Sequence, residues 1–290
     1  MNQTNQILPL VSIGLPVYNG SIKKFDYSIN IEKSLRSLIN QDYKNLEIIV
    51  SDNCSSDCTV EIIKKLIGTD KRVKFYQQKK PISPGENFEF VLNKSSGKYF
   101  KWNSHDDFIS KDFISKNVEF LEKNDDFIFS SSPCRFDNEL DIKNYKIFDF
   151  DCNQFNRVKN FFRIRSESHS FFYGLIKKEN LMERLKNHPW KALANDWILN
   201  LELLFDGKFK TIPEGEISIG TSGISKIGDG KGYVEEKQEL LTKIFPYREL
   251  FKRISKRIFN STKLSLFNKI CLIYICFKIN IAYFVLYKLK

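Results

Sequence analysis

The sequence places two adjacent carboxylates, Asp106 and Asp107, directly after a segment predicted to be a strand, residues 98–102. Hard divalent cations prefer carboxylate oxygens, and such a cation stabilises a diphosphate leaving group. Adjacent residues in a turn point in different directions. We therefore expect one carboxylate to bind a metal and its neighbour to accept a ribose hydroxyl. The alternative is a pair that only caps the following helix.

The elements before this pair predict a mostly parallel α/β sheet. The predicted strands are residues 7–15, 46–51, 73–76 and 98–102, and the predicted helices between them are residues 29–40, 60–67 and 86–93. This alternation is typical of parallel strands joined by right-handed crossovers. Ligands bind at the carboxyl ends of such strands, which is where Asp52 and the Asp106–Asp107 pair are expected.

The second half of the chain is less regular. Residues 127–131 and 171–176 are predicted strands, and residues 196–205 are a predicted helix. Six of the thirteen glycines fall between Gly215 and Gly232, which predicts a mobile loop.

Three motifs in order resemble family-two nucleotide-sugar glycosyltransferases with the GT-A (Rossmann-like) fold. They are VSIGLPVYNG from Val11, EIIVSDNCSSD from Glu47 and KYFKWNSHDD from Lys98. The resemblance covers about residues 10–225. It implies an inverting hexosyl- or N-acetylhexosaminyltransferase that uses a UDP-sugar or another nucleotide-sugar, with Mn²⁺ or Mg²⁺ as cofactor.

The resemblance also assigns roles by position. Residues of the first loop match those that pack around the base: Pro16, Tyr18 and Asn19. Asp52 and Asn53 match an acidic pair that binds the edge of the uracil, although Asn53 stands where relatives often have Asp. Asp106 matches the position that binds the ribose, and Asp107 matches the metal ligand.

Two further features of the resemblance concern the reaction itself. Asp196, which opens a predicted helix, matches the catalytic base that takes the proton of the acceptor hydroxyl. The alternative is a helix N-cap. A later segment resembles the loop that closes over the diphosphate, with Ser222, Ser225 and Lys226 as candidate ligands; a plain surface loop is the alternative.

The net charge of +11 lies mostly in the C-terminal segment. Residues 248–290 contain ten Lys or Arg and one acid, which is +9, and residues 1–247 carry the remaining +2. A nucleic-acid binder would spread its basic residues over a binding face, so no nucleic-acid partner is expected. We predict a catalytic domain over residues 1–247 and a basic, apolar helical appendage over residues 248–290.

The appendage is predicted to lie on an anionic membrane surface. Residues 251–267 alternate basic and apolar side chains at helical spacing, as interfacial helices do. Residues 270–287 either lie on the membrane, span it or pack on the domain, since 18 residues is near the lower limit for a span and Lys278 opposes insertion. With no signal peptide and six cysteines expected to be reduced, a cytoplasmic protein on the inner face of the membrane is predicted.

The function predicted from these features is sugar transfer to a glycan or lipid-linked acceptor in cell-surface polysaccharide synthesis. A metal-dependent nucleotidyltransferase is the rival enzyme, but it usually has a Gly-rich basic loop after the first strand, where this chain has Pro16 to Gly20. A non-catalytic membrane-bound scaffold of the same fold is the second rival. The presence of all four acids, Asp52, Asp106, Asp107 and Asp196, argues against that scaffold. The oligomeric state is left open.

Overall fold

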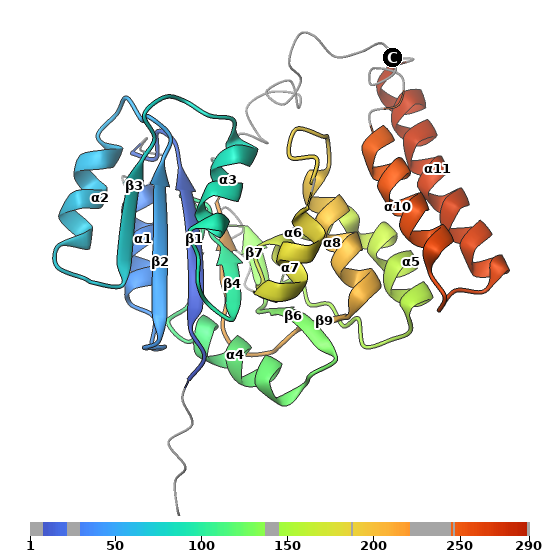
Figure 1. Ribbon diagram of the computed structural model, residues 1–290, viewed down its shortest axis with the longest axis horizontal. Helices are drawn as coiled ribbons and strands as arrows, with labels where there is room; N and C mark the ends of the chain where they lie inside the picture. The colour runs from blue at the N-terminus through green and yellow to red at the C-terminus, as the bar shows by residue number, and fades with distance from the viewer. Residues whose placement is uncertain are drawn as a thin grey trace, which may run out of the picture.

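The computed structural model describes residues 8–21, 30–136, 145–186, 188–220, 245 and 247–288, with side chains up to residue 281. Ten strands and the helices between them form an α/β protein with a mostly parallel central sheet (Figure 1). The candidate loop residues Ser222, Ser225 and Lys226 lie outside the described residues.

A seven-stranded sheet has the order β3-β2-β1-β4-β8-β6-β9. Its strands are β1 (Val11–Val17), β2 (Leu46–Asp52), β3 (Val73–Gln77), β4 (Tyr99–Trp102), β6 (Phe127–Ser131), β8 (Leu175–Lys177) and β9 (Lys208–Thr211). Only β8 runs antiparallel to its neighbours in this sheet. The strands β1 and β2 are buried along their whole length, as expected for parallel strands covered on both faces.

The order of the strands creates a topological switch point between β1 and β4. The chain proceeds from β1 to β2 and β3 on one side, and then returns to place β4 on the other side of β1. In open α/β sheets the crevice at such a point, outside the carboxyl ends of the strands, is the usual ligand site. Residues 18–19 and 103–107 follow these two strand ends.

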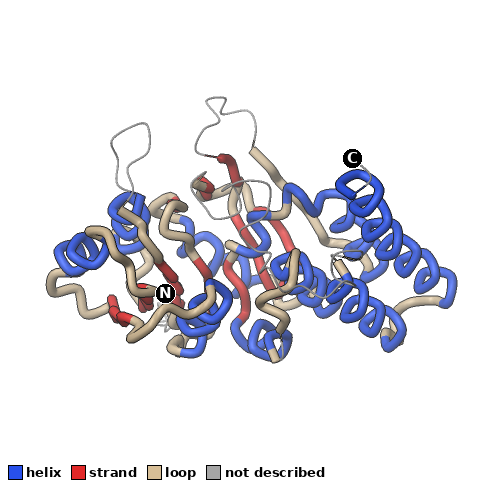
Figure 2. Tube along the Cα trace, turned by 90° about the horizontal axis from the view of Figure 1, so that it is seen from above, coloured by secondary structure: helices blue, strands red, loops and turns tan. Residues whose placement is uncertain are grey.

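Helices cover both faces of the sheet, and the buried side chains form two hydrophobic clusters. One cluster includes α1 (Asn30–Ile39), α2 (Thr59–Ile67) and α4 (Phe113–Lys123). The other includes α3 (Pro84–Asn93), α5 (Gln154–Ile164), α6 (His169–Phe172), α7 (Lys178–Leu185) and α8 (Asn195–Asp206). The view from above in Figure 2 shows the strands between these groups of helices.

Gly14 lets α3 approach β1 closely. A Cβ atom at this position would lie 2.6 Å from Cγ2 of Val91 and 2.7 Å from the ring of Phe100. Only glycine therefore permits this packing, which sets α3 against the strand that leads to the candidate base-binding loop.

The first half of the fold matches the sequence prediction, and the second half differs in two places. Residues 171 and 172 end the helix α6, so only the last part of the predicted strand at 171–176 is a strand, β8. The glycine-rich segment begins with a short strand, β10 (Ile217–Ile219). It pairs with β5 (Phe108–Ile109) and β7 (Cys134–Phe136) in a second sheet.

The C-terminal segment forms α10 (Arg248–Asn260) and α11 (Leu266–Lys288), with α10 between α11 and α8 (Figure 1). Part of the predicted apolar face of this segment is turned inward. Ile254 and Ile258 on α10 and Leu264 after it are buried in the same cluster as α8. Arg253 pairs with Glu202, and Arg257 pairs with Asp206. The helix α10 is thus packed into the domain rather than appended to it.

Among the described residues, no helix is both long enough and apolar enough to cross a membrane.

Candidate active site

The loops after β1 and β2 are fastened together at the carboxyl edge of the sheet. The backbone N–H of Asn19 donates a hydrogen bond to Ser55 Oγ at 2.9 Å, and Asn19 Oδ1 accepts one from the Ser56 N–H at 2.9 Å. Asn19 and Cys54 both have positive φ, of 48° and 59°. Such backbone strain persists only where surrounding contacts hold it, and it is concentrated at functional sites.

Asp52 and Asn53, the predicted base-binding pair, have different surroundings. Asn53 donates from Nδ2 to the Ile82 carbonyl at 2.8 Å and accepts the Ile82 N–H on Oδ1 at 2.9 Å. Its amide therefore fastens the segment before α3. Asp52 is fully buried and accepts one backbone N–H, from Ser55, on Oδ2. Its Oδ1 is buried with no hydrogen-bond partner among the described residues, so it is the acceptor left for a ligand.

Tyr18 and Pro16 complete the predicted base site. Pro16 is the sixth residue of β1, so that strand extends past the point where the sequence predicted a loop. Tyr18 follows the strand and is 50% exposed. The exposed phenol ring thus lies at the end of β1, which is paired with the end of β2 where Asp52 lies.

Asp106 and Asp107 are both buried in the turn after β4. Asp106 accepts a hydrogen bond from Ser104 Oγ at 2.6 Å. Asp107 accepts the Gly220 N–H on Oδ1 at 2.8 Å, whereas its Oδ2 is buried without a hydrogen-bond partner in the part of the chain that the structure describes. A Cβ atom on Gly220 would lie 2.4 Å from the Asp106 carbonyl oxygen. Glycine at the end of β10 is therefore required beside the acidic pair.

A buried lysine next to the pair was missed by the sequence analysis. Lys101 is fully buried, and its Nζ donates to the carbonyls of Trp102 and Tyr173 and to Oδ1 of Asn103. Burial lowers the pKa of Lys101 and raises that of Asp107, and each charge offsets part of the shift of the other. A lysine between Phe100 and Trp102 in an otherwise apolar strand is the signal that could have revealed it.

Asn103 stabilises the same turn through hydrogen bonds of its side chain. It is fully buried, and its Nδ2 donates to the Asp107 carbonyl at 3.0 Å and to Ser34 Oγ on α1 at 3.0 Å. Lys101 and Asn103 together hold the turn that carries the acids, so both are positioning residues.

Asp196 lies in a separate pocket of about 370 Å³ near the start of α8. Aromatic side chains make up much of the lining: Phe88, Phe172, Tyr173, Trp190, Trp197 and Tyr247. Asp196 is half-buried, and desolvation raises the pKa of its carboxyl group to about 6. A carboxylate with a pKa in this range is suited to accept a proton near neutral pH.

The Asp196 pocket adjoins the end of β4. Trp102, the last residue of β4, is stacked on Phe172 with ring centroids 4.9 Å apart and packs edge-on against Trp190. Both of these rings line the pocket. Tyr173, another lining residue, accepts the hydrogen bond from Lys101. Residues 101 and 102 thus connect the two sites. Lys101 holds the turn of the acidic pair, and Trp102 packs against the pocket wall.

The residue two positions before Asp196 has a strained backbone conformation. Ala194 precedes α8 with φ 59° and ψ 37°, in the left-handed region that alanine seldom adopts. Asn195 donates from Nδ2 to the Trp190 carbonyl at 2.6 Å. Asn195 therefore holds the turn in front of the predicted base. Asp196 is not the N-cap residue of α8, since that position is occupied by Ala194.

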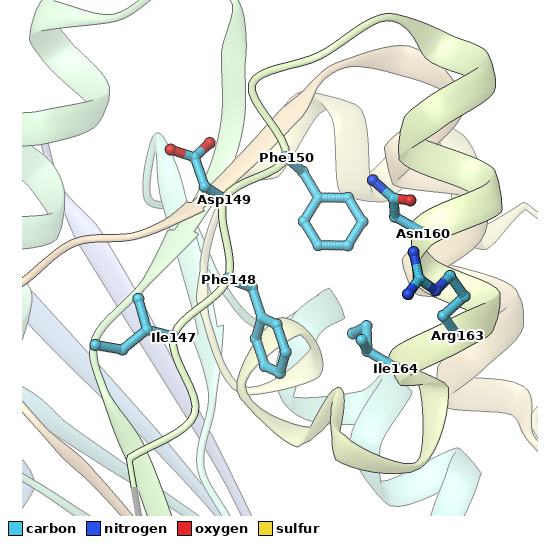
Figure 3. A pocket seen from close by; sticks show the side chains of 7 residues that line it. All are labelled: Ile147, Phe148, Asp149, Phe150, Asn160, Arg163 and Ile164. Atoms are coloured by element: carbon cyan, nitrogen blue, oxygen red, sulfur yellow. The ribbon is translucent and has the colours of Figure 1, made fainter.

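A second pocket of about 410 Å³ lies between residues 147–150 and α5 (Figure 3). Its one acid, Asp149, pairs with Lys210 at 3.0 Å. The acids that the sequence singled out are not among its lining residues. The pocket with Asp196 is therefore the better candidate for chemistry.

The described residues form no preformed metal cage. Within the described ranges, no three or more His, Cys, Asp and Glu side chains are grouped to hold a metal ion. Asp107 Oδ2 is nevertheless a buried carboxyl oxygen with no hydrogen-bond partner among the described residues. A cation held by one or two carboxylates together with water and phosphate oxygens, as Mg²⁺ commonly is, fits such a donor set.

The strand order and the site at its switch point define the class of the protein, an α/β fold of the GT-A type. S. aureus TarS has this architecture, with a TM-score of 0.66 over 94% of this chain and 72% of the TarS chain, at 15% identity. One TarS structure of the same TM-score contains UDP-GlcNAc. A mannosyltransferase from Pyrobaculum calidifontis, in complex with GDP-Man and Mn²⁺, matches 96% of this chain and 76% of its own at 16% identity, with a TM-score of 0.57.

Sequence comparison defines the family. The model of glycosyl transferase family 2 matches residues 12–178, which is more than half of the chain. The chain belongs to this family.

Curated relatives match in part. A β-1,3-glucosyltransferase from Campylobacter jejuni, named for GalNAc(5)-diNAcBac-PP-undecaprenol, is 26% identical over 58% of this chain and 57% of that protein. An uncharacterised glycosyltransferase of Haemophilus influenzae is 34% identical over 40% of this chain and 44% of that protein. Streptococcus pneumoniae GlyA is 28% identical over 66% of this chain and 27% of GlyA. The matched part thus spans about half or less of these relatives.

Proposed function

We propose that this chain transfers a sugar from a nucleoside-diphosphate donor, with UDP as the favoured carrier, to a hydroxyl group of an acceptor. One observation carries the proposal: Asp107, which has a buried oxygen without a described partner, and the pocket that holds a base of raised pKa both adjoin the end of β4, and Asp52, with a second such oxygen, ends β2 in the same sheet. A buried carboxylate oxygen without a partner is costly. The oxygens of Asp52 and Asp107 are therefore sites where a ligand would recover that cost.

The donor would occupy the switch point between β1 and β4. Asp52 Oδ1 would accept an N–H of the base, the exposed Tyr18 ring would pack beside it, and Asp106 would accept a ribose hydroxyl. Asp107 would hold Mn²⁺ or Mg²⁺, and when bound this cation supplies positive charge to the diphosphate as it leaves. The donor sugar would then be directed toward the Asp196 pocket, and we favour a hexose or N-acetylhexosamine.

The reaction is a direct displacement with inversion at the anomeric carbon. Asp196 accepts the proton of the acceptor hydroxyl, whose oxygen forms a bond to the anomeric carbon. The bond from that carbon to the diphosphate oxygen breaks, and the nucleoside diphosphate leaves with the electron pair. The aromatic lining of the Asp196 pocket provides flat apolar walls that exclude water from the acceptor.

The acceptor is proposed to be a lipid-linked glycan in cell-surface polysaccharide synthesis. This part of the proposal is supported by the undecaprenol-linked acceptor in the name of the Campylobacter jejuni relative and by the basic C-terminal segment. The protein would then act on the inner face of the cytoplasmic membrane.

A donor panel tests the proposal. Purified protein is incubated with UDP- and GDP-sugars and with Mn²⁺ or Mg²⁺, and release of the nucleoside diphosphate is followed with and without lipid-linked glycan extracts. We expect release from at least one UDP-sugar, accelerated by an acceptor and lost on chelation of the metal. Release of pyrophosphate instead would indicate nucleotidyl transfer. Absence of release from every donor would contradict the proposal.

A further inference from the structure

The outer side of α11 carries a row of large exposed apolar side chains. These residues, which we call the α11 ridge, are Leu266, Phe267, Ile270, Tyr274, Phe277 and Ile281. Their exposed fractions range from 40% for Ile281 to 78% for Phe267. Scattered apolar residues are normal on a protein surface, but a contiguous row of them marks an interaction site.

Helical geometry places the ridge on one face. With about 100° between successive residues, all six positions fall within an arc of roughly 100°. The buried residues Leu272, Cys276 and Ile279 lie on the opposite face, in the core with α5 and α8. The helix α11 therefore has two apolar faces, and the domain covers only one of them. Figure 1 shows α11 at the edge of the molecule, beyond α10.

Basic side chains border the ridge. Lys278 is exposed beside it, with its Nζ 4.9 Å from the centroid of the Tyr274 ring. Phe277 on the ridge contacts Phe251 on α10, and the exposed Lys252 is the next residue along α10. Lys256, one turn further, is also exposed. An apolar row with lysines at its margins is the pattern of a helix that lies in a membrane interface.

Charge distinguishes between the possible occupants of this surface. Residues 248–290 carry a net charge of +9. A second copy of the chain would bring the same basic segments together, and like charges across an interface oppose association. An anionic lipid surface attracts each lysine near it and accepts apolar side chains below its headgroups.

We propose that the α11 ridge is a membrane-docking surface that inserts its apolar side chains into an anionic lipid monolayer, with the bordering lysines on the headgroups. The helix lies in the plane of the interface and does not cross it. This inference deepens the proposed function by naming the surface that would bring the site to a lipid-linked acceptor. It is measured independently of sugar transfer, so the failure of one does not imply the failure of the other.

Vesicle binding of matched isoleucine variants tests the apolar part. Ile270 on the ridge and Ile147 in the second pocket are 60% and 61% exposed, so Ile270→Glu and Ile147→Glu make the same change at equal exposure. The full chain is floated with phosphatidylcholine vesicles that contain phosphatidylglycerol. We expect Ile270→Glu to weaken binding by at least about tenfold, as expected when a charge replaces a buried apolar side chain in the interface, and Ile147→Glu to bind like the wild type.

Two further comparisons complete the test. Phe267→Glu provides a second ridge variant in case Ile270→Glu does not fold. The double variant Lys252→Gln, Lys256→Gln should weaken binding to the anionic vesicles by about tenfold or more. The control, Lys64→Gln with Lys65→Gln on α2, removes the same charge from exposed lysines on another part of the molecule and should have little effect (Figure 1).

Three results would overturn the proposal. The first is unchanged vesicle binding by both ridge variants. The second is equal binding to vesicles of phosphatidylcholine alone, since the bordering lysines would then contribute nothing. The third is a dimer, detected by light scattering, that Ile270→Glu dissociates, because the ridge would then bind a second copy of the chain.

Discussion

Asp52, Asp107 and Asp196 are each shielded from solvent in a way that leaves the carboxylate available to a ligand. The sequence alone cannot show this feature. Asp52 and Asp107 each use one oxygen on a backbone N–H and leave the other without a described partner. Asp196 is desolvated among aromatic rings, which raises the pKa of its carboxyl group. A purely structural carboxylate would have both oxygens satisfied.

Replacing Asp196 by Asn should lower turnover by at least about a hundredfold, the usual scale for loss of a general base. Affinity for the nucleotide should change little, because Asp196 lines the pocket rather than the strand end that holds Asp52. Steady-state rates and UDP titrations measure the two effects. An equal loss of nucleotide affinity would place Asp196 in the donor site instead.

The pKa of Asp196 also predicts a pH dependence. The base is the ionised form, which is present above its pKa of about 6 and is lost as the pH falls below that value. The wild-type rate at low substrate should therefore fall about tenfold per pH unit below pH 6 and level off above it. The residual rate of Asp196→Asn should lack this acid limb. A wild-type profile that stays flat down to about pH 5 would contradict the assignment.

Lys101 should matter for stability in a way that surface lysines do not. Lys101→Met would leave the buried acceptors of Asn103 and Tyr173 without their donor, at a cost of at least about 2 kcal/mol. Lys98→Met, which removes a half-exposed lysine paired with Glu122, should cost less than about 1 kcal/mol. Urea unfolding measures both. Equal losses of unfolding free energy in the two variants would mean that Lys101 does not hold the turn.

At the scale of elements, the sequence predicts the first half of the fold because its signals are local. Strands β1 and β2 are continuous apolar runs, and the helices between them have regular spacing. The turn before α8 could not be predicted, because nothing in the residue type of Ala194 signals a left-handed backbone. The segment at 171–176 was mispredicted because Phe171 and Phe172 are buried from a helix, and apolarity alone does not distinguish the two.

The sequence also could not show that α10 packs into the core. A basic amphipathic helix has the same sequence pattern whether its apolar face contacts lipid or protein. In the structure α10 contacts protein, because Arg253 and Arg257 form ion pairs with Glu202 and Asp206 on α8. Deleting all residues after Tyr247 would remove Leu250, Ile254 and Ile258 from the core, so that deletion would not leave an intact domain.

The integration of α10 predicts a stability difference. Ile254 is fully buried, and Ile254→Ala should lower the free energy of unfolding by about 2–5 kcal/mol. Ile270→Ala, on the exposed ridge of α11, should change it by no more than about 0.5 kcal/mol. Thermal or urea unfolding measures both variants. A small effect of Ile254→Ala would mean that α10 is separable from the catalytic domain.

At the scale of the molecule, the proposed nucleotide site, the Asp196 pocket and the C-terminal helices belong to one packed structure. The cluster that contains Trp102 also contains α8, α10 and α11. The sequence predicted where the acids Asp52, Asp106 and Asp107 lie, because they follow strand ends. It could not predict which apolar face of the C-terminal segment is covered, since that depends on long-range packing of α10 on α8 and of α11 on α5.

The central claim is that Asp52 and Asp107 form a nucleotide site that a metal completes, and UDP binding measured by calorimetry tests it most directly. Wild-type protein and Asp196→Asn should bind UDP with similar affinity in Mn²⁺ and more weakly in EDTA, whereas Asp107→Asn should bind UDP weakly in both. Thermal melting of each variant verifies that the fold is kept. A folded wild-type protein that binds neither UDP nor GDP, or an Asp107→Asn variant with unchanged metal-dependent binding, would contradict the account.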